Sequence, residues 1–156
     1  MPTSLQQELK MRRPFESREQ EAALNLARTN DRLQIEFTRL FRQHGITPAQ
    51  FNILRILRGA GEPLPSLEVA ERLVTVVPGI TGLIDRLERL ELVCRKRPEA
   101  DRRVVLVELT RQGRAVLAAL DTPVLELHRT LLGHLSQREL RQLNSLLDKA
   151  RAGLET

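Results

Sequence analysis

The chain has 156 residues, with 25 Lys and Arg against 20 Asp and Glu and a formal net charge of +5. This length can bury a hydrophobic core unaided, and the single Cys excludes an internal disulfide and any CxxC site. No apolar segment suits a signal peptide or a membrane span, so a cytoplasmic protein without membrane contact is expected. The charge favours a polyanionic partner, although Arg-rich composition can also serve only solubility. Without Trp or Tyr, base stacking on single strands is disfavoured and duplex nucleic acid is favoured.

The first predicted helix follows a polar arm. Residues 1–18 are mostly polar and are expected to be flexible, whereas residues 19–43 carry Leu26, Leu33 and Leu40 at seven-residue spacing. This recurrence places the three leucines along one stripe of an amphipathic helix. The sequence therefore predicts one long helix here.

The second predicted helix begins with a capping box. Thr47-Pro48-Ala49-Gln50 combines an N-cap Thr, a Pro at the first helical position and a Gln three residues after the cap. The helix is expected to run through Arg58. Residues 59–65, with two Gly and two Pro, are expected to form a turn.

Two further helices are predicted in the middle of the chain. Ser66 is placed to cap a short helix through Leu73, and after a break at Val74-Thr75 another helix is predicted to Leu90. The apolar side chains of the latter fall within one arc and leave an opposite face that is small, polar or charged. That face comprises Pro78, Thr81, Gly82, Asp85, Arg86 and Arg89.

The remainder predicts a hairpin and two helices. Residues 92–97 and 103–109 are rich in strand-forming side chains and flank a polar loop that starts with Pro98, as expected of a β-hairpin. Thr110 is expected to cap a helix to about Leu132, with a kink at Pro123. A second capping box, at Ser136, opens the final helix, whose apolar residues are Leu140, Leu143, Leu146 and Leu147.

Two short helices followed by a basic hairpin are typical of a winged helix-turn-helix. A helix fills the major groove of DNA when its outward side chains are small or polar, as Gly79, Thr81 and Gly82 are. The hairpin can bring Arg102 or Arg103 to the minor groove. Taken singly, the helix face and the loop would each more often be only a solvated surface. Their order along the chain favours DNA binding.

Residues 46–113 contain the motifs ITPAQFNILRIL, PLPSLEVAERL, VPGITGLIDRLERLELVCRK and DRRVVLVELTRQG. In combination and spacing these resemble the winged-helix core of the MarR family of transcriptional regulators. The resemblance implies a mainly α fold with a small β-hairpin wing, its winged helix-turn-helix core at 46–109 flanked by N- and C-terminal dimerisation helices at 19–44 and 110–156. Gly82 departs from the Arg of many members, which leaves the base preference open. Glu91 stands where many members carry Gly.

The resemblance also implies site residues. It places a recognition helix at about 77–90, a wing at about 98–103, and a dimer interface that includes Leu26, Leu33, Leu140, Leu143 and Leu147. In similar proteins the wing Asp orients an Arg, which maps to Asp101 with Arg102 or Arg103. The residues expected at DNA are Ser66, Thr75, Pro78, Gly79, Thr81, Gly82, Asp85, Arg86, Arg89, Arg95, Arg97, Asp101, Arg102 and Arg103.

Two of these residues have alternative roles. Asp85 either accepts a hydrogen bond from cytosine, holds a neighbouring Arg in place, or pairs with Arg89 one turn later without a role at DNA. Ser66 either places helix-start amides at a phosphate or only caps its helix.

The family further implies a ligand cavity between the dimer helices and the DNA-binding core. Its candidate lining residues are Phe37, Phe41, His44, Phe51 and Arg55, although Phe residues at helical spacing also suit a core. The expected effector is a small molecule, phenolic or another lipophilic anion. Urate is disfavoured, because the urate-sensing branch relies on a pocket Trp that this chain lacks.

No cofactor is expected. Cys94 suits a small strand residue better than a redox sensor, and the three His lack the spacing of a metal site on one helix. No catalytic arrangement stands out, so an enzyme is not expected. We predict a homodimeric regulator, a repressor that binds pseudo-palindromic duplex DNA and that a small-molecule effector releases from it. The alternative is a winged-helix module that binds protein without specific DNA binding, against which the basic wing argues.

Overall fold

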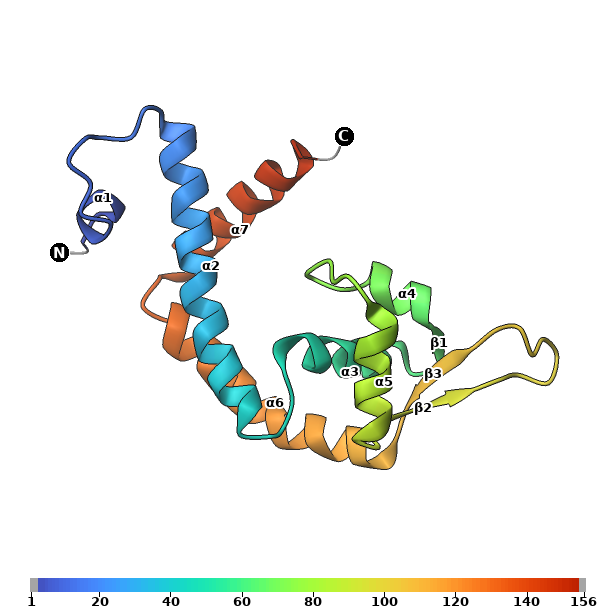
Figure 1. The fold of residues 1–156 in the computed structure, drawn as a ribbon. Coiled ribbons are helices and arrows are strands. Elements are labelled where there is room, and N and C mark those ends of the chain that lie inside the picture. Colours follow the sequence, from blue (N-terminus) through green and yellow to red (C-terminus); the bar gives the residue numbers. More distant parts are fainter. Residues whose placement is uncertain (1–2, 155–156) are drawn as a thin grey trace. The chain divides into compact units, whose positions relative to one another are not determined.

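The computed structural model describes residues 3–154 (Figure 1). The described part is mainly helical, with one small antiparallel sheet. The chain divides into two compact units, one up to Leu117 and one from Ala118 onward, and the boundary falls inside helix α6 (Arg111–Leu132). The predicted class, mainly α with a small β wing, is confirmed.

The first two long helices form close to their predicted positions. Helix α2 spans Arg18–Arg42 and helix α3 spans Pro48–Ala60. The capping box of α3 is confirmed, since Thr47 Oγ1 accepts from the backbone N–H of Gln50 at 3.2 Å and Gln50 Oε1 accepts from that of Thr47 at 2.9 Å. The helix runs two residues beyond its predicted end, because the chain turns only at Gly61, which has a left-handed φ of +71°.

Within residues 1–18, which were expected to be a flexible arm, the structure contains the short helix α1 (Leu5–Glu8). The first residue of this turn is buried, and the carboxylate of Glu8 binds Arg32 of α2 at 2.7 Å and Arg28 at 3.7 Å. The local composition did not indicate this order, because the ion-pair partners of Glu8 lie on a different helix.

A three-stranded antiparallel sheet of order β1-β3-β2 supports the wing. The predicted hairpin is confirmed as β2 (Val93–Lys96) and β3 (Leu106–Leu109), joined by a longer loop than expected. Strand β1 (Leu64–Pro65) lies in the segment predicted to be a turn, because two residues are too short to show an alternating pattern. The β2–β3 register pairs Val93 with Leu109, Cys94 with Glu108, Arg95 with Val107 and Lys96 with Leu106.

Helix α4 (Ser66–Glu71) is shorter than predicted and is capped differently. Ser66 is its first helical residue, so the prediction that Ser66 is the N-cap is wrong. Pro65 occupies the cap position, where no side chain caps the helix. Pro65 also pairs with β3 as part of strand β1, which fixes its extended backbone, and the helix starts one residue earlier than predicted.

Helix α5 spans Ile80–Arg89, so the predicted start near Val77 is wrong. Gly79 is its N-cap, with a φ of +78°, a left-handed conformation that interrupts a helical run and that L side chains rarely adopt. Pro78 therefore lies in the loop before the helix and not in its first turn. Gly79 was predicted to serve as a small outward residue; it is also required at this position because the backbone there is left-handed.

The core of the first unit lies between α3, α4, α5 and the sheet. Helix α6 begins against this core: Thr110 Oγ1 accepts from the backbone N–H of Gly113 at 3.0 Å, which confirms the predicted cap, and donates to the carbonyl of Glu91 at 2.6 Å. Gly113 lies so near Leu92 that no larger residue fits. The fully buried side chains of this unit are Ile53, Leu54, Val69, Ile84, Leu87, Val93, Val107 and Leu117.

The second unit holds the rest of α6, which continues across Pro123, and helix α7 (Gln137–Ala152). The capping box at Ser136 is confirmed, with Ser136 Oγ and Glu139 each bonding the other's backbone N–H. No residue of α7 is buried, although the helix carries a leucine stripe. Among the described residues, no helix is long and apolar enough to cross a membrane.

Candidate nucleic-acid interface

Helix α5 separates a buried face from an exposed one. Ile84 and Leu87 are completely buried, whereas Thr81, Arg86 and Arg89 are exposed, together with Gly82. The exposed face is small near the start of the helix and cationic near its end. This is the arrangement that lets a helix approach base edges while Arg side chains reach phosphates or guanine.

The segment before α5 extends this exposed face. Thr75, Pro78 and Gly79 are exposed in the loop between α4 and α5, and Ser66 is half-buried at the start of α4. The structure therefore brings the predicted helix-turn-helix residues together on connected elements of the first unit.

The wing loop, residues 97–105, holds its own shape. Asp101 Oδ1 accepts from the backbone N–H of Arg103 at 3.0 Å, and Arg97 Nη1 donates to the carbonyl of Arg102 at 3.0 Å. The implied pairing of Asp101 with a wing Arg is seen here as a contact with the backbone of Arg103 and not with a guanidinium group. Within the part of the chain that the structure describes, the guanidinium groups of Arg102 and Arg103 have no hydrogen bond or ion pair, and both residues are exposed.

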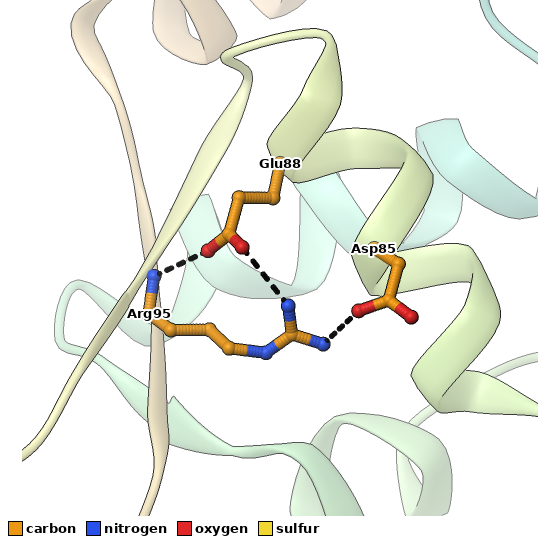
Figure 2. Close-up of polar contacts among 3 residues, drawn as sticks. All are labelled: Asp85, Glu88 and Arg95. Carbon is orange, nitrogen blue, oxygen red and sulfur yellow. Dashed lines mark hydrogen bonds and ion pairs between the residues drawn. The ribbon is translucent and has the colours of Figure 1, made fainter.

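Arg95 joins the wing to α5 (Figure 2). Its Nη2 donates to Asp85 Oδ1 at 2.6 Å, and its Nη1 donates to Glu88 Oε1 at 3.1 Å. Its backbone N–H donates to Glu88 Oε2, also at 3.1 Å. Of the roles left open for Asp85, the i,i+4 pair with Arg89 does not form, since Asp85 instead holds Arg95, ten residues later in the chain. We call Asp85, Glu88 and Arg95 the helix–wing clamp.

The electrostatics of β2 follow from these contacts. Partial burial lowers the pKa of Arg95, but the hydrogen bond and charge of Asp85, and then those of Glu88, raise it by more. On the opposite face of the strand, Lys96 pairs with Glu108, whose hydrogen bond and charge raise the pKa of Lys96. Both cations of β2 are thus bound within the protein.

Glu88 and Lys96 were not among the site residues predicted from the sequence. Glu88 lies one turn after Asp85 on the same helix face, a spacing that signals a shared partner. The partner itself is on a strand, where only the alternation of Arg95 and Lys96 across the two faces of β2 could have indicated it.

The candidate pocket residues form an aromatic stack in part. The rings of Phe37 and Phe41 lie 5.9 Å apart and those of Phe41 and Phe51 lie 4.4 Å apart, joining α2 to α3. Phe41 is buried, whereas His44 is half-buried and Arg55 is exposed. The three Phe come together, and the two polar candidates lie at different depths.

The predicted interface leucines are accessible in the single chain. Leu26 is 47% exposed and Leu143 is 37% exposed, while Leu33, Leu140 and Leu147 are half-buried. Leu24 and Ile35 of α2 and Leu146 of α7 are also exposed. Exposed apolar side chains on these two long helices make them candidate contact faces.

Known proteins share this chain's sequence pattern. The family model described as MarR family matches residues 46–105, from the start of α3 into the wing. A homoprotocatechuate degradative operon repressor of Escherichia coli is 30% identical over 116 residues, covering 72% of this chain and 76% of that protein. YkoM, an HTH-type transcriptional regulator of Bacillus subtilis, is 33% identical over 145 residues, covering 90% and 93%.

Solved structures share the fold. A MarR transcription factor from Planctomyces limnophilus is 41% identical with a TM-score of 0.66, covering 86% of this chain and 98% of that one. A mutant MarR of Escherichia coli complexed with operator DNA is 28% identical with a TM-score of 0.75, covering 82% and 91%. BpsR of Bordetella bronchiseptica, whose DNA binding is regulated by 6-hydroxynicotinic acid, is 29% identical with a TM-score of 0.76, covering 89% and 98%.

Proposed function

The chain belongs to the MarR family of transcriptional regulators, and we propose that it represses transcription by binding pseudo-palindromic duplex DNA as a homodimer. One observation carries the proposal: the exposed face of α5, with Arg86 and Arg89, is attached to a wing whose Arg102 and Arg103 are unpaired among the described residues. Unpaired guanidinium groups are available to phosphates and base edges.

Each element contacts a different part of the DNA, according to the chemistry of its side chains. Thr81 and Gly82 let α5 approach the base edges, and Thr81 contacts a base or a thymine methyl. Arg102 or Arg103 enters the minor groove, where a narrow groove concentrates negative potential. Arg86 and Arg89 bind phosphate or guanine, and the loop residues Thr75, Pro78 and Gly79 and the start of α4 at Ser66 contact the backbone.

The dimer is proposed from the apolar faces of α2 and α7. Leu26, Leu33, Leu140, Leu143 and Leu147 are its candidate contacts, and the exposure of Leu26 and Leu143 in the single chain supports a second copy as the covering partner. A two-fold dimer presents two recognition helices to successive major grooves, about 34 Å apart, which is why the site is pseudo-palindromic.

A small aromatic effector completes the proposal. BpsR, a relative of similar length, responds to 6-hydroxynicotinic acid, which supports a phenolic or related anionic ligand here. Phe37, Phe41 and Phe51 supply aromatic surface for such a ring, and His44 and Arg55 supply polar groups near it on the same helices or the adjoining turn. A differential affinity of about 1–3 kcal/mol between the two dimer states suffices to release DNA.

The test is selection of duplexes from a random library by the purified protein, followed by footprinting on the enriched sequence. Two protected half-sites of related sequence, about 10 base pairs apart and inverted, are expected. Failure to enrich any sequence would favour the alternative function, a winged-helix module that binds protein. Addition of 6-hydroxynicotinic acid to the complex then tests the effector class.

A further inference from the structure

The proposed function does not explain the helix–wing clamp at the base of the wing, in which Arg95 bridges Asp85 and Glu88. Asp85 and Glu88 lie one turn apart on one face of α5, and the two Nη atoms of Arg95 reach one carboxylate each, at 2.6 Å and 3.1 Å. A guanidinium group suits this bridge because its donors are fixed in a planar fork. A Lys ammonium would approach one carboxylate at a time.

The bridge is also tied to the backbone. Glu88 accepts from both the side chain and the backbone N–H of Arg95, so its carboxylate holds the strand as well as the guanidinium (Figure 2). The Arg95 side chain is 26% exposed, less than the 42–43% of its two partners. It is therefore more sheltered than the isolated surface ion pairs that contribute little.

Arg95 lies near the end of the paired part of the hairpin, so its contacts with α5 affect the orientation of the wing loop. Arg95 pairs with Val107, which is completely buried, and only one further pair, Lys96 with Leu106, follows before the loop. The loop of residues 97–105 has no strand pairing beyond that point. A change of angle at Arg95 is thus carried to the wing tip.

Charge gives a second reason for the bridge. Asp85 and Glu88 lie on the helix that is proposed to approach a polyanion, where unpaired carboxylates would repel phosphate. Arg95 compensates them from within the protein, so its guanidinium is already occupied. Among the described residues, the unpaired cations of this region are instead on the α5 face and the wing tip.

We infer that Arg95 is a positioning residue: it sets the wing against α5 and compensates Asp85 and Glu88, and it does not itself contact DNA. This assignment rests on the proposed function. It gives Asp85 the role of anchoring an Arg, and it adds Glu88 as the second anchor. The direct-contact role that the sequence suggested for Arg95 is the competing account.

A double-mutant cycle separates the two accounts. The affinity for the selected duplex is measured for the wild type, Arg95→Met, the pair Asp85→Asn with Glu88→Gln, and the triple variant. The inference predicts that Arg95→Met weakens binding by roughly tenfold in the native background and by less than about threefold when both carboxylates are already neutral. An equal loss in both backgrounds would overturn the inference, because a direct phosphate contact does not depend on the carboxylates.

Arg95→Lys supplies the second measurement and covers the case in which Arg95→Met fails to fold. A single ammonium cannot bridge the carboxylates, so binding should weaken nearly as much as in Arg95→Met. A phosphate contact would tolerate Lys, and wild-type affinity in this variant would therefore contradict the inference. If the wild-type protein selects no duplex, the proposed function fails first. If it does bind and the losses are additive, only the role of Arg95 is overturned.

Discussion

The arginines of the wing look alike in the sequence but have different surroundings. Arg95 is bound to two carboxylates and Arg97 to the carbonyl of Arg102, whereas the guanidinium groups of Arg102 and Arg103 are unpaired among the described residues. The number of basic residues near a hairpin therefore overstates how many can bind DNA. Only the partners of each side chain separate the cations that shape the wing from those that are available.

The wing tip yields a residue-scale prediction. Arg103→Ala should weaken binding to the selected duplex by about 1–3 kcal/mol, because it removes an unpaired charge without disturbing any side-chain contact. The measurement is fluorescence anisotropy, with Arg42→Ala as the control, since Arg42 is an exposed Arg on α2, outside the winged helix. Equal affinity of Arg103→Ala and the wild type would rule out the wing as a DNA contact.

The sequence predicted which residues of α5 are exposed, but it did not predict the contacts of Asp85 and Asp101. The exposed face of α5 was predictable, because the helical period assigns Thr81 and Arg86 to one side. The partner of Asp85 was not, because local spacing favoured Arg89 and the actual partner is on another element. Asp101 was expected to orient Arg102 or Arg103, and the structure shows it accepting a hydrogen bond from the backbone N–H of Arg103, as an Asp side chain in a tight turn can.

At the scale of elements, those with a strong local signal were predicted well. The capping boxes at Thr47 and Ser136 place the starts of α3 and α7, since these caps depend only on residues three apart. Strand β1 was missed because two residues contain no pattern, and its pairing with β3 is a long-range contact. The start of α5 was misplaced because Pro is tolerated in a first helical turn, whereas the left-handed Gly79 stops the helix just after it.

The contact between α6 and the sheet yields a prediction about the stability of the protein. A Cβ on Gly113 would lie 2.2 Å from the carbonyl oxygen of Leu92 and 2.7 Å from Leu109 Cδ1. Backbone cannot move away cheaply, so Gly113→Ala should lower the free energy of unfolding by about 2–3 kcal/mol. Urea denaturation of the purified protein measures this.

Gly82→Ala is the matched control for that experiment. Gly82 is also helical, but nothing lies within 4 Å of its Cβ position. This substitution should raise the free energy of unfolding by about 0.5–1 kcal/mol, because Ala has the higher helix propensity. If the two variants have equal stability, the close approach of Gly113 to the sheet is not what holds α6 in place.

The apolar faces of α2 and α7 indicate that one copy of the chain does not cover all of its own apolar surface. Leu26 and Leu143 are apolar side chains on amphipathic helices, and the described chain leaves them accessible. The heptad-like spacing made the stripes visible in the sequence. Which copy covers which face depends on pairing between chains, which periodicity does not encode.

Leu143→Asp tests the proposed dimer. A charge introduced into an apolar interface is costly, so this variant should be monomeric or insoluble by size-exclusion chromatography with light scattering. Ser145→Asp is the control, because it adds the same charge about 200° around α7, on an exposed position. A soluble dimer of Leu143→Asp with wild-type stability would mean that α7 is not part of the interface.

Specific binding of duplex DNA is tested by a titration of the selected duplex and a scrambled duplex at about 50 and 200 mM salt, followed by fluorescence anisotropy. We predict tighter binding to the selected duplex at both salt concentrations, together with a steep loss of affinity for both as salt rises, because Arg–phosphate contacts release counterions. Equal affinity for the two duplexes would contradict sequence recognition by α5, and affinity that does not change with salt would contradict the wing and helix arginines as the DNA contacts.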